Sequence, residues 1–177
     1  MPARRAPSRV FVNVPYDGPY ERLFVSLIAG LVALGRQPVC ALAAPDTGKG
    51  RLRRILDLIA RCDLSIHDLS RVQRARGVPR FNMPFELGLC CAVARFRRGH
   101  RYYVFEEQRH RLSKSLSDLG GYDPQVHGGT PRGIAGPSQL LGNHPPRPYD
   151  RTDDVAWGES RGAHTQAKAR ARSQRRL

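Results

Sequence analysis

Two carboxylates, Glu86 and Asp68, stand in apolar surroundings, where a charged group loses hydration energy. Glu86 lies in "MPFELG", at the expected start of a buried helix, and Asp68 ends the apolar run in "SIHDLS". Two carboxylates that face one crevice suit sugar chemistry, because one can hold hydroxyl groups while the other stabilises a developing oxocarbenium ion. We therefore take Glu86 and Asp68 as candidate catalytic groups.

Each of these residues also has a purely structural interpretation. If Met83 is the N-cap and Pro84 opens the helix, Glu86 is the third helical residue, where a glutamate can reach back to the cap amide and complement the helix dipole. Asp68 could close its own loop through an Asx-turn. His67 should point to the opposite face of the strand from Asp68, so we expect it to be a core or supporting histidine with its polar atoms satisfied.

The segment "NVPYDGPYERL" places Asn13, Tyr16 and Asp17 after the first apolar run. A loop that opens onto a helix N-terminus can bind phosphate, although the Pro and Gly residues here would also suit a simple turn. The later "DTGKG" lacks the spacing of a phosphate loop, so we do not expect a nucleoside triphosphate site. Lys49 and Arg51 could still flank a phosphate.

Short apolar runs alternate with segments of helical periodicity. This order predicts an α/β fold in which helices cover both faces of a parallel sheet. The ligand crevice of such a sheet lies beyond the carboxyl ends of its strands, where all the candidate residues above are expected to meet. The predicted strands are 9–15, 37–44, 63–70 and 101–107, and the predicted helices are 18–35, 51–62, 83–95 and 109–119.

The segment "SDLGGYDPQVH", beyond the fourth strand, is dense in polar groups. Asp118, Asp123 and His127 are expected to be capping and turn residues. The alternative is that they fold back and brace the loop after the third strand.

Composition divides the chain of 177 residues into a predicted α/β domain over 9–136, a disordered basic N-terminus over 1–8 and a disordered basic tail over 137–177. The net charge of +15 comes from scattered arginines, which favours loose, charge-driven contact with nucleic acid over specific recognition.

The four cysteines, Cys40, Cys62, Cys90 and Cys91, form no CxxC pair. They are expected to be reduced core residues of a cytoplasmic protein, and no metal site is predicted. No apolar stretch reaches the roughly 18 residues that a membrane span needs, and no secretory signal is predicted.

The strings "VFVNVPYD", "IHDLS" and "RFNMPFELGL", followed by "SDLGGYD", resemble an uncharacterised bacterial family. That family is similar to the wider group of Toll/interleukin-receptor (TIR)-like and nucleoside 2-deoxyribosyltransferase-like nucleotide-binding domains. The resemblance spans about residues 9–127 and implies a flavodoxin-like three-layer sandwich with a parallel sheet of four to five strands. It also implies an N-glycosidic bond as the target. By position, Glu86 matches a helix-borne glutamate that contacts the ribose, and Asp68 matches a strand end that faces the ligand.

In the same resemblance, the first-strand loop with Tyr16 and Asp17 lines the nucleotide site. Ser70 belongs to the strand-end motif and Asn82 to the loop before the helix, so both are predicted substrate contacts together with Asn13. Two departures stand out. The pair before Glu86 is Pro-Phe, unlike the usual TIR arrangement, and "PSQLLGNHPPRP" replaces an expected last helix, which suggests a frameshifted tail.

The resulting hypothesis is a TIR-like nucleotide-binding domain that acts as an N-glycosidase on NAD(P)+ or a related nucleotide, by hydrolysis or ribosyl transfer, in bacterial defence. NAD would be a substrate or ligand, and no cofactor is expected. One alternative is a non-catalytic nucleotide-sensing or adaptor module, and a second is a basic nucleic-acid-associated protein. The expected partners are a nucleotide and a second copy or another protein, without a membrane.

Overall fold

The structure is a computed structural model that describes residues 8–41, 50–72, 80–112, 116 and 124–136. The chain divides into two units, 1–146 and 147–177, and every described residue belongs to the first. The elements in chain order are β1 (Arg9–Asn13), the short helix η1 (Gly18–Tyr20), α1 (Glu21–Ala33), β2 (Gln37–Cys40), α2 (Arg51–Ala60), β3 (Leu64–Asp68), α3 (Asn82–Phe96), β4 (Arg101–Glu106) and β5 (Gln125–Val126). Residues 131–136 are also helical.

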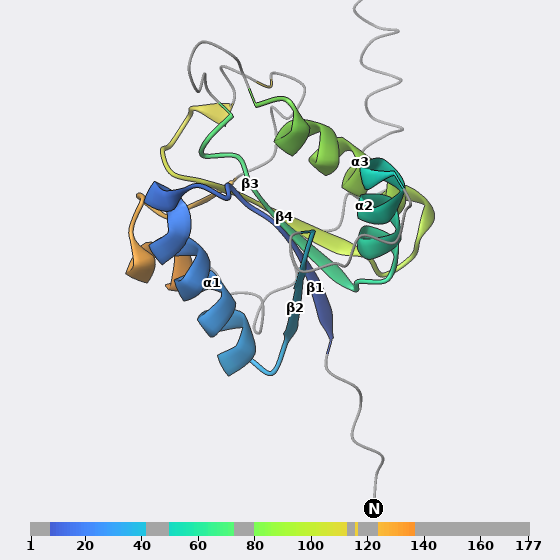
Figure 1. The fold of residues 1–177 in the computed structure, drawn as a ribbon, viewed down its shortest axis with the longest axis horizontal. Helices are drawn as coiled ribbons and strands as arrows, with labels where there is room; N and C mark the ends of the chain where they lie inside the picture. Colours follow the sequence, from blue (N-terminus) through green and yellow to red (C-terminus); the bar gives the residue numbers. More distant parts are fainter. Residues whose placement is uncertain (1–7, 42–49, 73–79, 113–115, 117–123, 137–177) are drawn as a thin grey trace, which may run out of the picture. The chain divides into compact units, whose positions relative to one another are not determined.

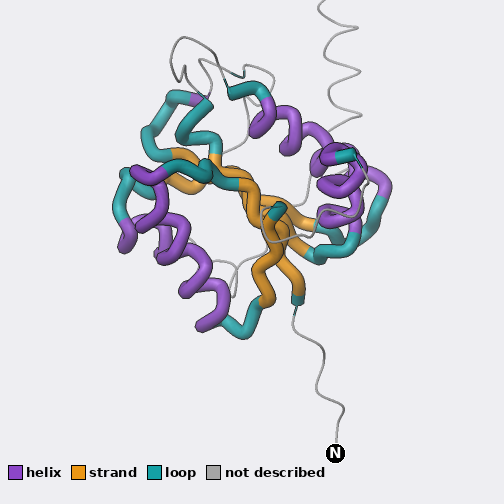
Figure 2. The backbone as a smooth tube through the Cα atoms, viewed as in Figure 1, coloured by secondary structure: helices purple, strands orange, loops and turns teal. Residues whose placement is uncertain are grey.

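The five strands form one parallel sheet in the order β2-β1-β3-β4-β5. Helix α1 covers one face, and α2 and α3 cover the other (Figure 1), so that the strands form a single layer between helices (Figure 2). This is the flavodoxin-like strand order, whose direction of growth reverses between β1 and β3. The predicted α/β fold is confirmed, and the ligand crevice of such a fold lies at the carboxyl ends of β1 and β3.

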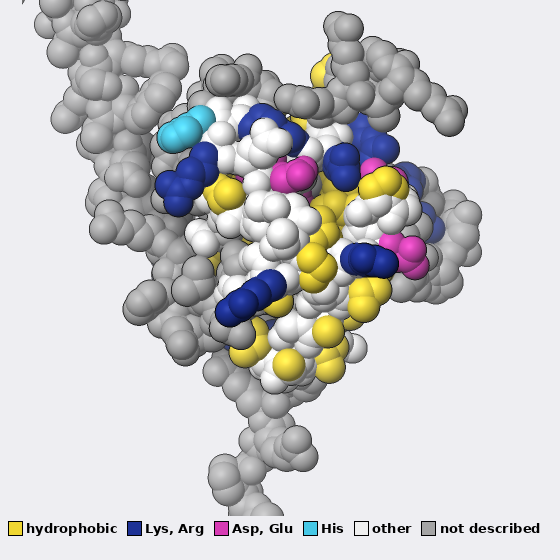
Figure 3. Space-filling model, turned by 90° about the vertical axis from the view of Figure 1, so that its left-hand side faces the viewer, with side chains coloured by type: hydrophobic (Ala, Val, Ile, Leu, Met, Phe, Trp, Pro, Cys, Tyr) yellow, Lys and Arg dark blue, Asp and Glu magenta, His cyan; other side chains and the backbone are white. Residues whose placement is uncertain are grey.

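Alternation along the strands builds the two halves of the core. In β1, Val10 and Val12 pack with Leu27 of α1, whereas Phe11, between them, packs with Ile59 of α2 and with α3. Successive side chains of a strand point to opposite faces, so one strand of apolar residues serves both helical layers. The outer side of α1 remains partly apolar, and hydrophobic side chains gather in the lower half of the face that it covers (Figure 3).

Helix α3 begins earlier than the sequence predicted. Its N-cap is Phe81, whose carbonyl accepts the N–H of Phe85 at 3.1 Å, so Asn82 is the first helical residue and Glu86 the fifth. Pro84 lies in the first turn, where its missing N–H breaks no helical hydrogen bond. The predictions that Met83 is the N-cap, that Glu86 is a third-position capping residue and that Asn82 lies in the loop before the helix are therefore wrong.

The sheet of five strands agrees with the four to five that were expected, but the position of β5 was not predicted, because the polar segment that holds it was expected to be a loop. It pairs with the end of β4, where Phe105 lies opposite Gln125. The left-handed Gly35 (φ 67°) after α1 confirms the predicted helix end. The predicted helix over 109–119 falls mostly outside the described residues, as do the end of the second predicted strand and the two terminal segments, whose predictions stay untested. Within the described part of the chain, no helix is long and apolar enough to cross a membrane.

Candidate functional site

Asp68, at the carboxyl end of β3, is fully buried, and both its oxygens are occupied. Its Oδ1 accepts the backbone N–H of Ser70 at 2.8 Å, and its Oδ2 accepts the hydroxyl of Tyr20 and lies 3.0 Å from Nε2 of His127. Burial alone would raise the pKa of Asp68, but the contacts with His127, Ser70 and Tyr20 outweigh it and hold the pKa below its ordinary value. Asp68 is thus an ionised, fully partnered carboxylate.

His127 joins β5 to the loop after β3. Its Nδ1 accepts the N–H of Gly129 at 3.1 Å, so its Nε2 holds the proton and points at Asp68 and at the hydroxyl of Ser70, 3.0 Å away. A Ser-His-Asp triad needs the serine and the aspartate on different ring nitrogens, whereas here both meet Nε2. The cluster is therefore a structural brace, which confirms the second interpretation of His127; Asp118 and Asp123 lie outside the described residues.

Glu86 presents the opposite case. It projects from the inner side of α3 and is only 5% exposed, yet within the described residues its carboxylate makes no hydrogen bond. Its ionic partner among the described residues is the exposed Arg51 of α2, whose Nη2 lies 3.8 Å from Oε1. Burial raises the pKa of Glu86, and the charge of Arg51 offsets part of that rise. A buried carboxylate with unused oxygens is costly for the fold, so it needs a further explanation.

Tyr16 belongs to the surroundings of Glu86. Its hydroxyl donates to the carbonyl of Val12 at 3.2 Å, and its ring lies edge-on to Phe24. Burial raises the pKa of Tyr16, and negative charge on Cys40 and Glu86 raises it further. Tyr16 is thus a predicted substrate-binding residue that senses the charge of Glu86.

Asn13 links three elements at the end of β1. Its Nδ2 lies 3.1 Å from Nδ1 of His67 in β3 and 3.3 Å from the carbonyl of Met83 in α3. Burial lowers the pKa of His67 to about 3, so the ring is neutral, and its Nε2 is buried without a partner in the described residues. His67 does point away from Asp68, as predicted, but only half of its hydrogen-bonding capacity is satisfied. Asn13 itself acts as a clamp between layers.

Asp17 and Asn82 were also predicted to contact the substrate. Asp17 caps η1, because its Oδ1 accepts the N–H of Tyr20 at 3.1 Å, and its Oδ2 pairs with Arg80 at 2.9 Å. Asn82 is exposed at the start of α3. The structure therefore brings Tyr16 and Arg51 to Glu86, and Ser70 to Asp68, but it shows no contact between the two carboxylates.

The sequence analysis did not identify Tyr20 and Glu106 as residues of the candidate site. Tyr20 gives no pattern of its own, because its partner Asp68 is 48 residues away. Glu106 ends β4, is buried and pairs with Arg111 at 3.3 Å. The strand-end rule that selected Asp68 would also have found Glu106. No cluster of three or more metal-binding side chains occurs among the residues that the structure describes.

No family model and no curated protein matches the sequence. Among solved structures, the chain is similar to the Clostridium botulinum CMP N-glycosidase BcmB, with a TM-score of 0.50 and 18% sequence identity. The match covers 75% of this chain and 99% of that chain. At this identity the likeness concerns the fold alone. The chain therefore has an α/β fold like that of a nucleotide N-glycosidase.

Proposed function

We propose that the chain binds a nucleotide at the carboxyl ends of β1 and β3 and hydrolyses its N-glycosidic bond, with Glu86 as the catalytic carboxylate. The observation that supports this proposal is the buried Glu86 carboxylate, which has no hydrogen bond within the described residues. A carboxylate kept for stability is normally satisfied, as Asp68 is. Buried carboxyl groups with a raised pKa are typical of catalytic sites.

In this reaction the bond between the base nitrogen and C1′ of the ribose breaks. The base leaves with the electron pair of the bond, while water gives its oxygen to C1′ and releases a proton. Cytosine from CMP takes up a proton as it leaves, whereas nicotinamide leaves the pyridinium of NAD as a neutral molecule and needs none, so the proton from water goes to the solvent. Positive charge develops on the ribose, and the ionised Glu86 stabilises it. Arg51 keeps Glu86 ionised and offers a cation to a substrate phosphate, and Tyr16 positions the ribose or the base.

For the substrate, we propose NAD or a related nucleotide. CMP is the natural comparison, because the structural neighbour is a CMP N-glycosidase. A role in bacterial defence would follow from the cleavage of NAD, since loss of NAD stops a cell's metabolism. The two substrates release different bases, so a single assay separates them.

The test is base release by the purified full chain. We expect cytosine from CMP or nicotinamide from NAD, resolved by liquid chromatography, and a loss of at least a hundredfold in Glu86→Gln. The matched control is Glu21→Gln, which makes the same change at an exposed position in the first turn of α1 and should leave the rate unchanged. Equal rates in Glu86→Gln and the unmodified chain would refute the proposal.

The second candidate is a non-catalytic nucleotide-binding module. It is favoured by the occupied state of Asp68, because glycosidases commonly use two carboxylates, and of the two candidates Glu86 alone has oxygens without a hydrogen bond from the described residues. Calorimetry on the same two variants distinguishes the candidates. Nucleotide binding without base release would support the sensing module, and base release that depends on Glu86 would exclude it.

A further inference from the structure

His67 has a buried ring nitrogen that no described residue contacts. The side chain projects from β3 and is 0% exposed, and its Nε2 has no hydrogen-bond partner among the described residues. The ring stands beside the apolar ring of Phe11, with 6.0 Å between the two ring centroids. A buried polar atom without a partner is unfavourable for the fold, so this nitrogen needs an explanation just as the carboxylate of Glu86 does.

Asn13 determines which ring nitrogen of His67 carries the proton. Nδ2 of Asn13 lies 3.3 Å from the carbonyl of Met83 and 3.1 Å from Nδ1 of His67. The carbonyl can only accept, so Nδ2 belongs to the NH2 group of the amide, and Nδ1 of His67 accepts the second hydrogen bond of that group. Burial keeps the ring neutral, so its single proton is on Nε2. The nitrogen without a partner is therefore a donor.

On its N-terminal side, Glu86 is linked to His67 through Asn13. The carbonyl that Asn13 contacts belongs to Met83, three residues before Glu86 on the buried side of α3. Asn13 and His67 are direct neighbours in the pairing of β1 with β3. The ring of His67 therefore lies beside the turn of α3 that leads to Glu86.

On its C-terminal side, Glu86 is linked to the same face of β3. Cys90 lies four residues after Glu86 on the buried side of α3. Its thiol is 3.4 Å from Nε2 of His100, which is also 3.0 Å from the hydroxyl of Ser65. Ser65 is two residues before His67 in β3, so both side chains point to the same face of the sheet. Glu86 thus projects between two contacts with the strand face that carries His67.

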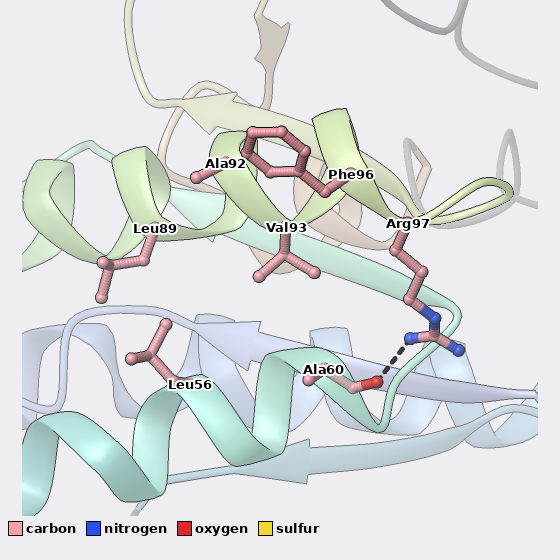
Figure 4. A pocket seen from close by; sticks show the side chains of 7 residues that line it. All are labelled: Leu56, Ala60, Leu89, Ala92, Val93, Phe96 and Arg97. Carbon is pink, nitrogen blue, oxygen red and sulfur yellow. Dashed lines mark hydrogen bonds between the residues drawn. The ribbon is translucent and has the colours of Figure 1, made fainter.

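Farther along α3, the contact with α2 is apolar and offers no acceptor to the buried ring N–H. Leu89 and Val93 point from α3 towards α2, beside a pocket of about 390 Å³ (Figure 4). Of the residues that line this pocket, only Arg97 has a polar side chain, and it is a donor, which meets the carbonyl of Ala60 at 2.6 Å. Glu86 is the one buried side chain of α2 and α3 in the described structure that has oxygen acceptors.

We propose that His67 is a positioning residue for Glu86, whose carboxylate it reaches through one buried water. This role rests on the proposed catalytic function of Glu86. The ring N–H has no partner within hydrogen-bond distance in the described residues, and polar groups that face each other over a longer distance are commonly bridged by water. A buried water needs about two to four polar partners, and the ring N–H and the carboxylate supply two of them. The water accepts from Nε2–H and donates to the carboxylate, which fixes Glu86 and favours its ionised form.

The charged and titratable groups around this pair come from other elements. Arg51 of α2 lies 3.8 Å from Glu86, and Tyr16, after β1, interacts with the charge of the same carboxylate. Burial lowers the pKa of His67 most, and the charge of His100, just before β4, lowers it further. Neither Arg51 nor Tyr16 makes a hydrogen bond to the carboxylate in the described structure, so the water held by His67 supplies the donor that an ionised Glu86 needs.

The test is the pKa of the Glu86 carboxyl group, measured by 13C NMR titration of the full chain, with Glu86→Gln to assign the signal. His67→Phe keeps a ring but removes Nε2–H, and we expect it to raise the pKa of Glu86 by at least about one pH unit. His67→Gln keeps an NH2 donor that can reach the position of Nε2, and it should raise this pKa by less than half as much. Both variants lose the acceptor for Asn13, so the donor alone distinguishes them.

The matched control is His100→Phe, which makes the same change at a buried histidine whose two ring nitrogens both have partners. It should lower the free energy of unfolding without moving the pKa of Glu86. In the unmodified chain, NMR of the His67 ring should show the proton on Nε2 and a cross-peak from that proton to a bound water. This spectrum needs no variant, so it tests the proposal even where a substitution disturbs folding.

An unchanged pKa of Glu86 in His67→Phe would overturn the proposal, and so would equal rises in His67→Phe and His67→Gln or a ring proton on Nδ1 of His67. The pH–rate profile of base release gives a second readout, because its acid limb should move upwards in His67→Phe by the same amount as the pKa. The NMR measurements need no turnover. A chain that shows the expected pKa changes but releases no base would therefore refute the proposed catalysis while supporting the link between His67 and Glu86.

Discussion

Replacing Asp68 by asparagine removes the acceptor around which Tyr20, Ser70 and His127 are arranged. The amide oxygen of the new asparagine can still accept the hydrogen bond from the N–H of Ser70. Its NH2 group, however, is a donor that faces two other donors, the hydroxyl of Tyr20 and Nε2–H of His127. A hydrogen bond to a charged group contributes about 1.5–3 kcal/mol, and a buried donor left without an acceptor costs more than the lost bond. We expect Asp68→Asn to lower the free energy of unfolding by about 3 kcal/mol at neutral pH.

Replacing Glu86 by glutamine should affect the free energy of unfolding in the opposite direction. Burial raises the pKa of Glu86, so its ionised form is unfavourable in the fold, and Glu86→Gln removes that cost. We expect no loss of stability and a gain of at most about 1 kcal/mol, as is common when a functional group is removed from a site. Glu86→Gln and Asp68→Asn thus form a matched pair of neutralised carboxylates.

The two effects also differ in their dependence on pH. The pKa of Asp68 is lowered in the fold, so its stabilisation is complete above the unfolded value of about 3.9 and is lost as pH falls through the folded value. The pKa of Glu86 is raised, so its destabilisation is present at neutral pH and disappears in acid. The stability difference between Asp68→Asn and the unmodified chain should shrink towards pH 3, and so should the gain in Glu86→Gln.

Urea unfolding followed by circular dichroism measures both effects, provided that the slope against urea stays constant. Glu21→Gln, at an exposed site, should change the free energy of unfolding by less than about 0.5 kcal/mol. A loss below about 1 kcal/mol in Asp68→Asn would mean that the network of hydrogen bonds does not hold the fold. If Glu86→Gln lost as much as Asp68→Asn, Glu86 would be a structural residue and the proposed function would lose its support.

Three further predictions concern single groups. Tyr20→Phe removes one donor to Asp68 but keeps the ring, so we expect a loss of about 1–2 kcal/mol in the same urea assay. Burial raises the pKa of Cys62 to about 11 and of Cys90 to about 12, so neither thiol should react with iodoacetamide at pH 7.5 in the folded chain, whereas both should react in urea, as peptide mass spectrometry will show. The rate of base release should fall as pH is lowered through a value above the 4.5 of an ordinary glutamate, because protonated Glu86 cannot stabilise a cation; a pH–rate profile tests this.

The parallel sheet could be predicted because the alternation of strands and helices leaves few other arrangements. The alternation of side chains along a strand was also informative, since it predicted that His67 points to the opposite face from Asp68. The sequence held little information on β5, because two residues give no period and Gln125 is polar. The start of α3 was misplaced because Phe81 makes no side-chain cap, so its backbone hydrogen bond leaves no signal in the sequence.

The sequence predicted which residues end the strands at the carboxyl edge of the sheet, but not the contacts that they make there. The rule that strand ends meet at one edge selected Asn13 and Asp68 correctly as residues of that edge. It could not reveal that Asp68 is saturated, since this depends on His127, which reaches it through the pairing of β5 with β4. Nor could it reveal that no described residue makes a hydrogen bond to the carboxylate of Glu86, because such partners come from residues that are distant in sequence.

Helix α3 carries Glu86 on its buried side, so the packing of this helix determines where the carboxylate lies. Since no hydrogen bond from the described residues fixes the carboxylate of Glu86, its position depends on the backbone of α3, which the described structure holds through Asn13 and the carbonyl of Met83. A catalytic carboxylate needs a rigid support, and here the support would come from the sheet.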